Sequence, residues 1–139
     1  PEVYYEDISF PNSIALGIEQ TISSFGLIIY SLQMLGSGSA SISDLGGPIM
    51  IAQLAGQTAE AGITPFLTFM ALLSVNLAFL NILPIPGLDG GHIFIHLIEG
   101  ALRRPLKIKT RIVIQQIGMA LLLMLMVTVI MQDLTRLFN

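Results

Sequence analysis

The residues best suited to chemistry in this sequence lie in one short stretch, Asn81–His92, which reads NILPIPGLDGGH. Its carboxylate, Asp89, follows closely on a long apolar segment, so we expect it at the edge of an apolar environment. A carboxylate in such a place is costly unless another charge compensates it. A divalent metal ion is the strongest compensation, and a salt bridge to Arg103 or Lys107 is the ordinary alternative. Both interpretations stay open on spacing alone.

Two prolines and three glycines give this stretch an irregular backbone. Pro84 and Pro86 lack an amide hydrogen and restrict the residue before each, so a helix that reaches this stretch must end at about Leu83. The glycines let backbone approach a ligand closely, which slightly favours the metal interpretation. Irregular backbone at membrane depth is tolerated only where protein buries it or where it lines a wet cavity.

A second group of potential metal ligands follows at helical spacing. His92 and His96 are four residues apart and Glu99 follows three later, so a helix would place all three on one face. Two histidines at this spacing can bind a metal, but no glutamate stands between them to act as a general base. Interfacial histidines that are satisfied by loop partners are the favoured interpretation.

Two segments without charged residues predict membrane-spanning helices. They are residues 65–83 and residues 112–132, and about 20 helical residues cross a hydrocarbon core of roughly 30 Å. The composition agrees, because 53% of the residues are hydrophobic and 11% are charged, whereas soluble domains carry about a quarter charged residues. We therefore predict an α-helical membrane protein with two transmembrane helices, and we expect Gly118 in the second to pack on other spans.

The segment before the first span is expected to form an amphipathic helix on the membrane surface. In residues 12–36 the apolar side chains recur at steps of three and four, and Glu19 and Gln20 lie on the opposite side. Such a helix lies in the interface rather than across it. Asn12 or Ser13 is available as its cap.

Two further segments complete the organisation. Residues 37–64 are read as a linker and a short helix from Ile49, with Pro48 well placed at its first position. Residues 1–11 are read as a short extended strand that Pro11 closes. With no partner strand in this sequence, this segment is interpreted as the end of another domain.

The distribution of charge predicts an orientation. Residues 84–111 join the two spans and contain five of the six basic residues, Arg103, Arg104, Lys107, Lys109 and Arg111. The positive-inside rule places residues 89–111 in the cytoplasm, with residues 1–64 and the tail 133–139 on the outer side. The net charge of −3 argues against a nucleic-acid partner.

The pattern NxxPxPxLDGGH of residues 81–92 resembles the signature of site-2 proteases, a family of intramembrane zinc metalloproteases that includes the bacterial regulator of sigma-E protease. Leu88-Asp89-Gly90 matches the LDG motif of that family. Residues 47–52 and 73–77 are also similar to this bacterial branch, and residues 1–10 resemble the close of its PDZ domain. The resemblance covers essentially all 139 residues.

The resemblance implies a zinc site shared between two parts of one enzyme. In the family, two histidines of an HExxH motif and the LDG aspartate hold Zn2+, and the glutamate of that motif is the general base. Asp89 matches the third metal ligand and is the expected catalytic residue. No HExxH occurs in this sequence. The chain is therefore expected to be a C-terminal half that is inactive without the missing N-terminal half.

The implied activity is hydrolysis of peptide bonds in transmembrane segments of protein substrates within the bilayer of the bacterial inner membrane. Cleavage of an anti-sigma factor in an envelope stress response is one such reaction. The resemblance predicts substrate contacts at Asn81, Asn76, Pro84 and Pro86, and support of Asp89 by His92, Gly90 and Gly91. For the two asparagines, an ordinary interhelical hydrogen bond is the alternative.

Two functions of other classes compete with the protease interpretation. A transporter half would use the helix break at residues 84–87 as a substrate site. A membrane-surface interaction fragment would use residues 13–61 to dock a partner. An inverted repeat or a coupling-ion requirement would favour the transporter, but no repeat is visible between the two spans.

Overall fold

The computed structural model describes residues 7–40 and 46–139, and every regular element in these ranges is a helix. The elements are α1 (Phe10–Gly36), α2 (Pro48–Ala61), α3 (Ile63–Ile82), α4 (Asp89–Leu102) and α5 (Ile108–Phe138). The predicted strand over residues 1–11 is wrong where it can be checked, because residues 7–9 are irregular and residues 10 and 11 are helical. Residues 1–6 lie outside the described ranges.

Helix α1 begins earlier than the sequence pattern predicts. Ser9 is its N-cap residue and Pro11 stands within the first two helical positions, where proline is favoured because its missing amide hydrogen has no helical acceptor. Pro11 therefore starts the helix rather than closing a strand. The predicted caps Asn12 and Ser13 are wrong, since both lie inside the helix, where the Ser13 hydroxyl donates to the Ser9 carbonyl.

Three helices are long and apolar enough to cross a membrane: α1, α3 and α5. Two of them were expected, and α1 is the addition. Helix α1 qualifies by its 27 residues and the low charge of its apolar window, and Thr21, Ser24 and Ser31 each donate to the backbone carbonyl four residues earlier. Hydroxyls that are satisfied within their own helix add less polarity to its surface than a count of polar residues suggests.

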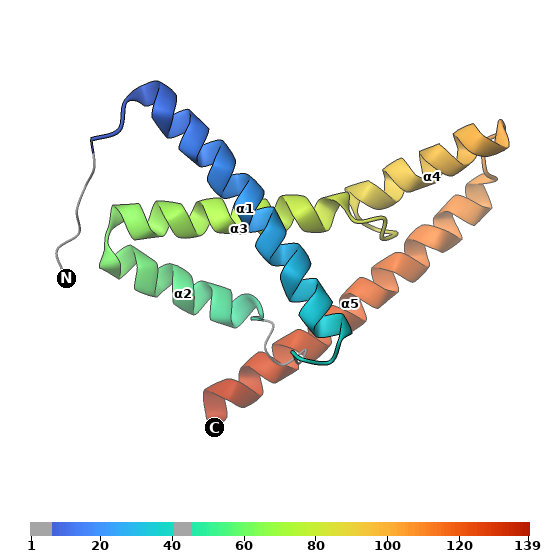
Figure 1. The fold of residues 1–139 in the computed structure, drawn as a ribbon. Coiled ribbons are helices and arrows are strands. Elements are labelled where there is room, and N and C mark those ends of the chain that lie inside the picture. Colours follow the sequence, from blue (N-terminus) through green and yellow to red (C-terminus); the bar gives the residue numbers. More distant parts are fainter. Residues whose placement is uncertain (1–6, 41–45) are drawn as a thin grey trace.

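Helices α2 and α3 form a tight hairpin (Figure 1). Pro48 is the first residue of α2, as its position in the sequence predicts. Gly62 joins the two helices with a φ of +128°, a backbone conformation that residues with a side chain rarely adopt. Helix α3 then ends at Ile82, close to the end predicted from the two prolines.

The predicted loop and the predicted tail both contain helical structure. Helix α4 occupies half of the 84–111 connection, and α5 starts four residues before the expected span and continues to Phe138. The tail 133–139 is thus part of α5 up to its last residue. Helix α5 runs back alongside α4, opposite in direction, and its C-terminal end reaches α2 (Figure 1).

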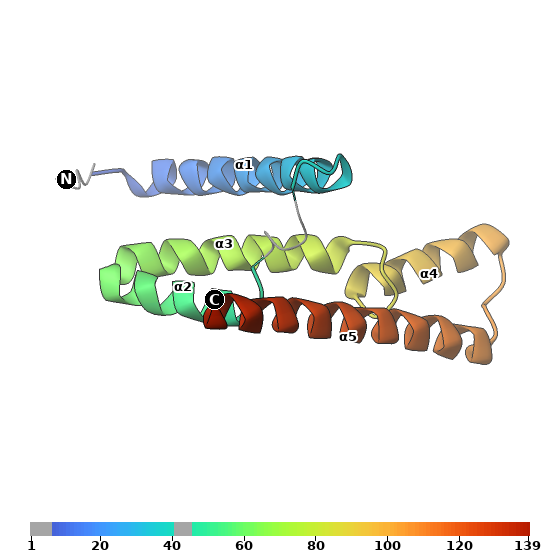
Figure 2. The same ribbon diagram turned by 90° about the horizontal axis from the view of Figure 1, so that it is seen from below.

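The helices lie in two layers. Figure 2 shows α1 above the layer that contains the other four helices. It contacts α3, where the rings of Phe25 and Phe79 meet edge to face with centroids 5.9 Å apart. Within the described ranges, Ile95 is the only large apolar side chain that is buried. Most apolar side chains of the long helices are therefore available to lipid or to other protein.

Candidate functional site

The candidate site is built around the break between α3 and α4, residues 83–88. The backbone turns twice in this segment: the Ile85 amide donates to the Leu83 carbonyl at 2.7 Å, and the Leu88 amide donates to the Ile85 carbonyl at 3.1 Å. Gly87 has a φ of +100°, which favours glycine. The two prolines thus end α3, and after the turn the chain becomes helical again at Asp89, the first residue of α4.

Two glycines let this turn fold back onto the first residues of α4. A Cβ atom on Gly90 would collide with the carbonyl oxygens of Ile82 and Leu83, and one on Gly91 with the carbonyl of Ile85. Both glycines are buried. Support of Asp89 by Gly90 and Gly91 stays a prediction, and close packing of the turn is the role for which the structure provides contacts.

A third glycine, in α5, holds the other side of the turn. A Cβ atom on Gly118 would collide with the Pro86 carbonyl and lie within contact distance of its ring. Gly118 is buried, and Leu122 one turn later approaches the Cβ position of Gly87 at 3.2 Å. The break is therefore fixed between α3, α4 and α5. Gly118 was expected to pack on another span, but its contacts in the described structure are with Pro86 in the turn.

Asp89 is the first residue of α4 and its side chain is exposed. A carboxylate is favoured in the first turn of a helix because the helix dipole is positive there. The alternative salt bridge is not formed, since the ion pairs of the described residues involve neither Arg103 nor Lys107. Those two residues lie at the opposite end of α4.

Asp89 fits one corner of a metal site and cannot hold a metal ion alone. Its carboxylate is an oxygen donor of the kind that zinc accepts. The described residues contain no group of three His, Cys, Asp or Glu side chains that could bind a metal ion together. Any zinc at Asp89 therefore needs ligands from outside residues 7–40 and 46–139.

The predicted substrate contacts lie on both sides of the break. Asn76 and Asn81 are half-buried on α3, the second of them one residue before its end. Pro84 is exposed, whereas Pro86 packs against Gly118. The break thus brings Asn81, Pro84 and Asp89 into one short segment, and Asn76 lies more than a turn away along α3.

His92 and His96 face α5, and they belong to no group of three potential metal ligands among the described residues. His92 and His96 line a cavity of about 140 Å³ between α4 and α5, together with Ile95, Arg111 and Gln115. The Nδ1 atom of His96 lies 3.4 Å from Oε2 of Glu99. The same Glu99 oxygen accepts a 2.7 Å hydrogen bond from the Arg111 guanidinium, so this carboxylate already pairs with a cation of the protein.

Glu99 fixes the connection between α4 and α5. Its Oε1 atom accepts a 3.0 Å hydrogen bond from the Leu106 amide. This bond lowers the pKa of Glu99, partial burial opposes it by raising the pKa, and the Arg111 guanidinium lowers it further, with a net pKa below the usual 4.5. Glu99 is therefore an ionised anchor rather than the metal-binding carboxylate of the His-x-x-x-His pattern.

Asp133 is the residue that sequence reasoning missed. It is 4% exposed in α5 and accepts hydrogen bonds from three amides at the start of α2: Gly47 at 3.2 Å, Ile49 at 3.1 Å and Met50 at 3.3 Å. A Cβ atom at Gly47 would collide with this carboxylate. The sequence around Gly47 cannot predict this cap, because the capping residue lies 86 positions further along the chain.

The sequence of this chain is similar to those of a known protein family. Residues 3–125 match the family described as Peptidase family M50. The chain belongs to Peptidase family M50. This confirms the resemblance to site-2 proteases, and together with the three long apolar helices it makes the chain part of a membrane protein.

Several M50 relatives are similar over nearly all of the chain. A protein of Vibrio cholerae, whose name describes a zinc metalloprotease, is 37% identical over 139 residues, which are 99% of this chain and 31% of that protein. The regulator of sigma E protease of Haemophilus influenzae is 41% identical over 125 residues, 90% of this chain and 28% of that protein. The chain thus spans about three-tenths of the length of these relatives.

Proposed function

We propose that this chain is the part of an intramembrane zinc endopeptidase that supplies the third metal ligand, Asp89, and the adjoining substrate contacts. The single observation that carries the proposal is the exposed Asp89 carboxylate at a helix break that three close-packed glycines hold in place. Membership of Peptidase family M50 supports this assignment, as do the names of the relatives.

The residues of the chain have distinct tasks in this proposal. Asp89 offers a carboxylate oxygen from the first turn of α4, where the helix dipole keeps negative charge favourable. Gly90, Gly91 and Gly118 keep the turn from moving because each is in contact with backbone. When bound, a zinc ion polarises a peptide carbonyl and activates water for its hydrolysis. The other ligands come from an HExxH segment elsewhere in the full protein.

The residues near the break are suited to bind an extended peptide. Asn81 and Asn76 carry amide groups that can both donate to and accept from a substrate backbone. Unpaired peptide groups in lipid cost several kcal/mol each, so an unwound transmembrane substrate needs such partners. Pro84 and Pro86 lack an amide hydrogen and keep the backbone of the break out of a regular helix. We assign His92, three residues after Asp89 on α4, the role of supporting the carboxylate.

We further propose a location in the bacterial inner membrane with residues 89–111 in the cytoplasm. The basic residues of this connection support that orientation. The hydrogen bonds of Asp133 support a common outer side for the end of α5 and the start of α2. The relative from Haemophilus influenzae is named as a regulator of sigma E protease, so an anti-sigma factor is our proposed substrate class.

The decisive experiment uses the full-length protein with Asp89→Asn, which keeps the size of the side chain and removes its charge. We expect cleavage of a transmembrane model substrate to fall below detection and the zinc content of the purified protein to fall as well. Glu60→Gln is the matched control, because Glu60 is an exposed carboxylate at the far end of α2. The control should keep both activity and zinc.

Full activity in the Asp89→Asn protein would end the proposal. Loss of activity with undiminished zinc would also contradict the role of Asp89 as a ligand. After zinc has been removed from all three proteins, the thermal unfolding of both variants should match that of the unmodified protein, because the Asp89 side chain is exposed and stabilisation by a bound metal no longer distinguishes the proteins.

A further inference from the structure

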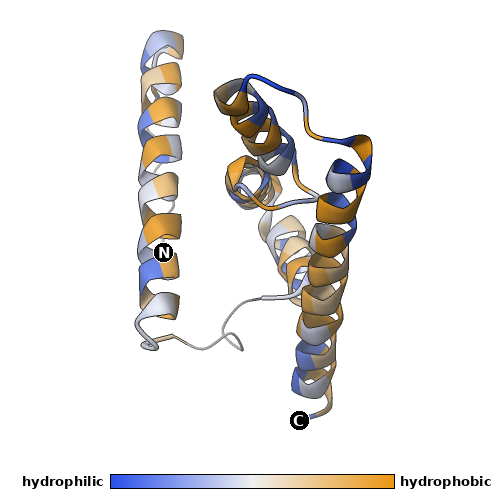
Figure 3. Cartoon of the chain, turned by 90° about the vertical axis from the view of Figure 1, so that its right-hand side faces the viewer, coloured by the Kyte–Doolittle hydropathy of each residue, from blue (hydrophilic) through white to orange (hydrophobic). Residues whose placement is uncertain are grey.

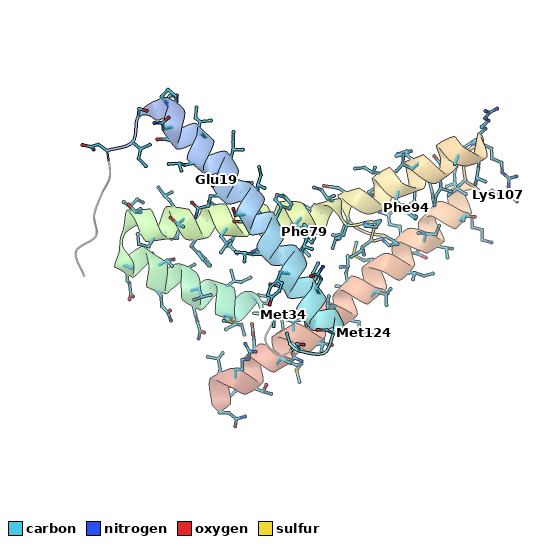
Figure 4. The ribbon with its side chains drawn as sticks, in the orientation of Figure 1. Glu19, Met34, Phe79, Phe94, Lys107 and Met124 are labelled. Atoms are coloured by element: carbon cyan, nitrogen blue, oxygen red, sulfur yellow. The ribbon has the colours of Figure 1, made fainter. Side chains whose placement is uncertain are left out.

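The connection between α4 and α5 concentrates positive charge on an exposed surface. Three exposed cations of this connection, Arg103, Arg104 and Lys107, and a fourth in the first turn of α5, Lys109, are together called the basic turn below. Figure 3 shows hydrophilic residues in this connection with an apolar stretch between them, and in Figure 4 Lys107 lies at the tip of the molecule. Four cations within seven residues repel one another unless an anion lies among them.

The nearest carboxylate does not supply that anion. Glu99 accepts hydrogen bonds from the Leu106 amide and the Arg111 guanidinium. Among the described residues, Glu99 forms ion pairs with His96 and Arg111 and with no member of the basic turn. Glu99 therefore shapes the basic turn by fixing its backbone and leaves its charges free.

The backbone at Arg103 is a second and independent observation. Arg103 has a φ of +52° and a ψ of 28°, the left-handed conformation that glycine or asparagine usually supplies after a helix. It is the only residue other than glycine with a positive φ in the described ranges. This conformation ends α4, with the Arg103 and Arg104 amides donating to the Gly100 and Glu99 carbonyls, and it thereby fixes where the basic turn begins.

The basic turn adjoins a candidate membrane span. Helix α5 begins at Ile108, between Lys107 and Lys109, and is long and apolar enough to cross a membrane. Ile108 at its start is 78% exposed, and Leu97 and Phe94 on α4 are 66% and 49% exposed. Cations beside exposed apolar side chains are typical of protein surfaces at the boundary between lipid headgroups and acyl chains.

We propose that the basic turn binds the phosphate groups of anionic phospholipids in the membrane that α5 crosses. Arginine suits this task because its planar guanidinium holds two phosphate oxygens at once. Lys107 and Lys109 add charge at the same depth. The site would anchor the break and Asp89 at a fixed level through α4. It requires only that α5 spans the membrane, so it stands apart from the proposed protease activity.

The test compares lipid preference in the full-length protein reconstituted in bilayers of phosphatidylcholine with a minor share of phosphatidylglycerol. Spin-labelled forms of the two lipids measure which is enriched at the protein surface. We expect several-fold enrichment of phosphatidylglycerol, which added sodium chloride weakens. Replacing the four residues (Arg103→Gly, Arg104→Gln, Lys107→Gln, Lys109→Gln) should remove the enrichment, at up to about fivefold for each cation near the surface.

Two further variants keep the test falsifiable if that protein folds poorly. A charge-preserving protein (Arg104→Lys, Lys107→Arg, Lys109→Arg) should retain the enrichment. Arg136→Gln removes a cation at the opposite end of α5 and should have no effect. Unchanged enrichment in the quadruple variant, or its loss in Arg136→Gln, would overturn the proposal. Displacement of the lipid by inorganic phosphate at constant ionic strength would overturn it too, since it would indicate a site for a soluble anion.

Discussion

At the scale of single residues, the glycines around the break act through the absence of a side chain. Gly90, Gly91 and Gly118 each lie where a Cβ atom would meet a backbone carbonyl. Each contact therefore brings two backbone segments closer than any other residue allows. The position of Asp89 depends on these contacts, because its own side chain has no protein partner in the described structure.

Gly118→Ala should destabilise the protein by about 1–3 kcal/mol, the usual cost of adding a methyl group to a filled space. The methyl group would push Pro86 and shift the turn that carries Asp89. Gly100→Ala is the matched control, because a Cβ atom there meets open space within a helix, and alanine should stabilise α4 by up to about 1 kcal/mol. Unfolding in detergent measures both. Equal effects would show that α5 does not pack on the turn.

The anchor at Glu99 should depend on pH. Its folded-state pKa is lowered below 4.5, so the ionised carboxylate stabilises the connection at every pH above the unfolded-state value. This stabilisation is lost as the pH falls from 4.5 through the folded-state pKa. The amide resonance of Leu106 should therefore shift only below that value.

Glu99→Gln tests the same anchor at neutral pH. The amide side chain can still accept from Leu106 but cannot attract Arg111, so trypsin should cleave more rapidly after Arg103 and Lys107; Arg104 precedes Pro105, which blocks cleavage there. Trypsin should cleave the Glu60→Gln protein at the same rate as the unmodified protein, because Glu60 is exposed in α2. If the Leu106 amide resonance still shifts at acid pH in the Glu99→Gln protein, a group other than Glu99 causes the shift.

At the scale of elements, α5 provides the N-terminal cap that α2 lacks in its own sequence. Gly47 is the N-cap residue of α2 and has no side chain to accept its free amides. The Asp133 carboxylate accepts three of them instead. It also places a negative charge at the positive end of the α2 dipole. The start of one helix is thus tied to the end of another.

Asp133→Ala should loosen the first turn of α2. A lost cap costs about 0.5–2 kcal/mol, which corresponds to roughly eightfold faster amide hydrogen exchange at the middle of that range. The amides of Ile49 and Met50 should show it, and those of α4 should not. Glu60→Ala, at the other end of α2, is the control. Unchanged exchange in Asp133→Ala would mean that water satisfies these amides equally well.

The ends of the helices show what the sequence could predict. The end of α3 followed from the two prolines, because proline chemistry acts locally. The ends of α5 were missed, because Arg111 and Asp133 were interpreted as the limits of the apolar span, whereas both are satisfied by distant partners, Glu99 and the start of α2. A charge that is paired through tertiary contacts does not stop a helix.

At the scale of the whole molecule, the described helices do not enclose a core. Ile95 alone among their large apolar side chains is buried. Their apolar surface must then contact lipid or the remaining part of an M50 protein. The sequence predicted this through its low charge content, and its motif predicts Asp89 as a metal ligand, which stays a prediction. It could not predict which groups hold the motif in place, because those contacts join residues far apart in the chain.

Cysteine labelling can test how the molecule sits in the membrane, because the chain has no native cysteine. Helix α5 has 31 residues and a length of about 46 Å, more than the roughly 30 Å of hydrocarbon. Lys109→Cys and Asn139→Cys in the full-length protein should therefore react with an impermeant reagent from opposite sides. Reaction from the same side would exclude α5 as a span.

The same reagent can decide between two and three spans. Ser23 lies in the middle of α1, beside Glu19 and Gln20 on its polar side. If α1 lies on the membrane surface, as its amphipathic pattern predicts, Ser23→Cys should be labelled from the outer side. Full protection of Ser23→Cys together with labelling of both helix ends from opposite sides would make α1 a third span.

The link between Asp133 and α2 has a consequence for biosynthesis. Asp133 is translated 86 residues after Gly47, which takes on the order of ten seconds at ribosomal speed. During that interval, while the polypeptide is inserted, the first amides of α2 have no Asp133 carboxylate as an acceptor. A fusion tag or truncation close behind Asp133 could therefore slow maturation of a segment that is distant in sequence, and pulse-chase proteolysis would detect the delay.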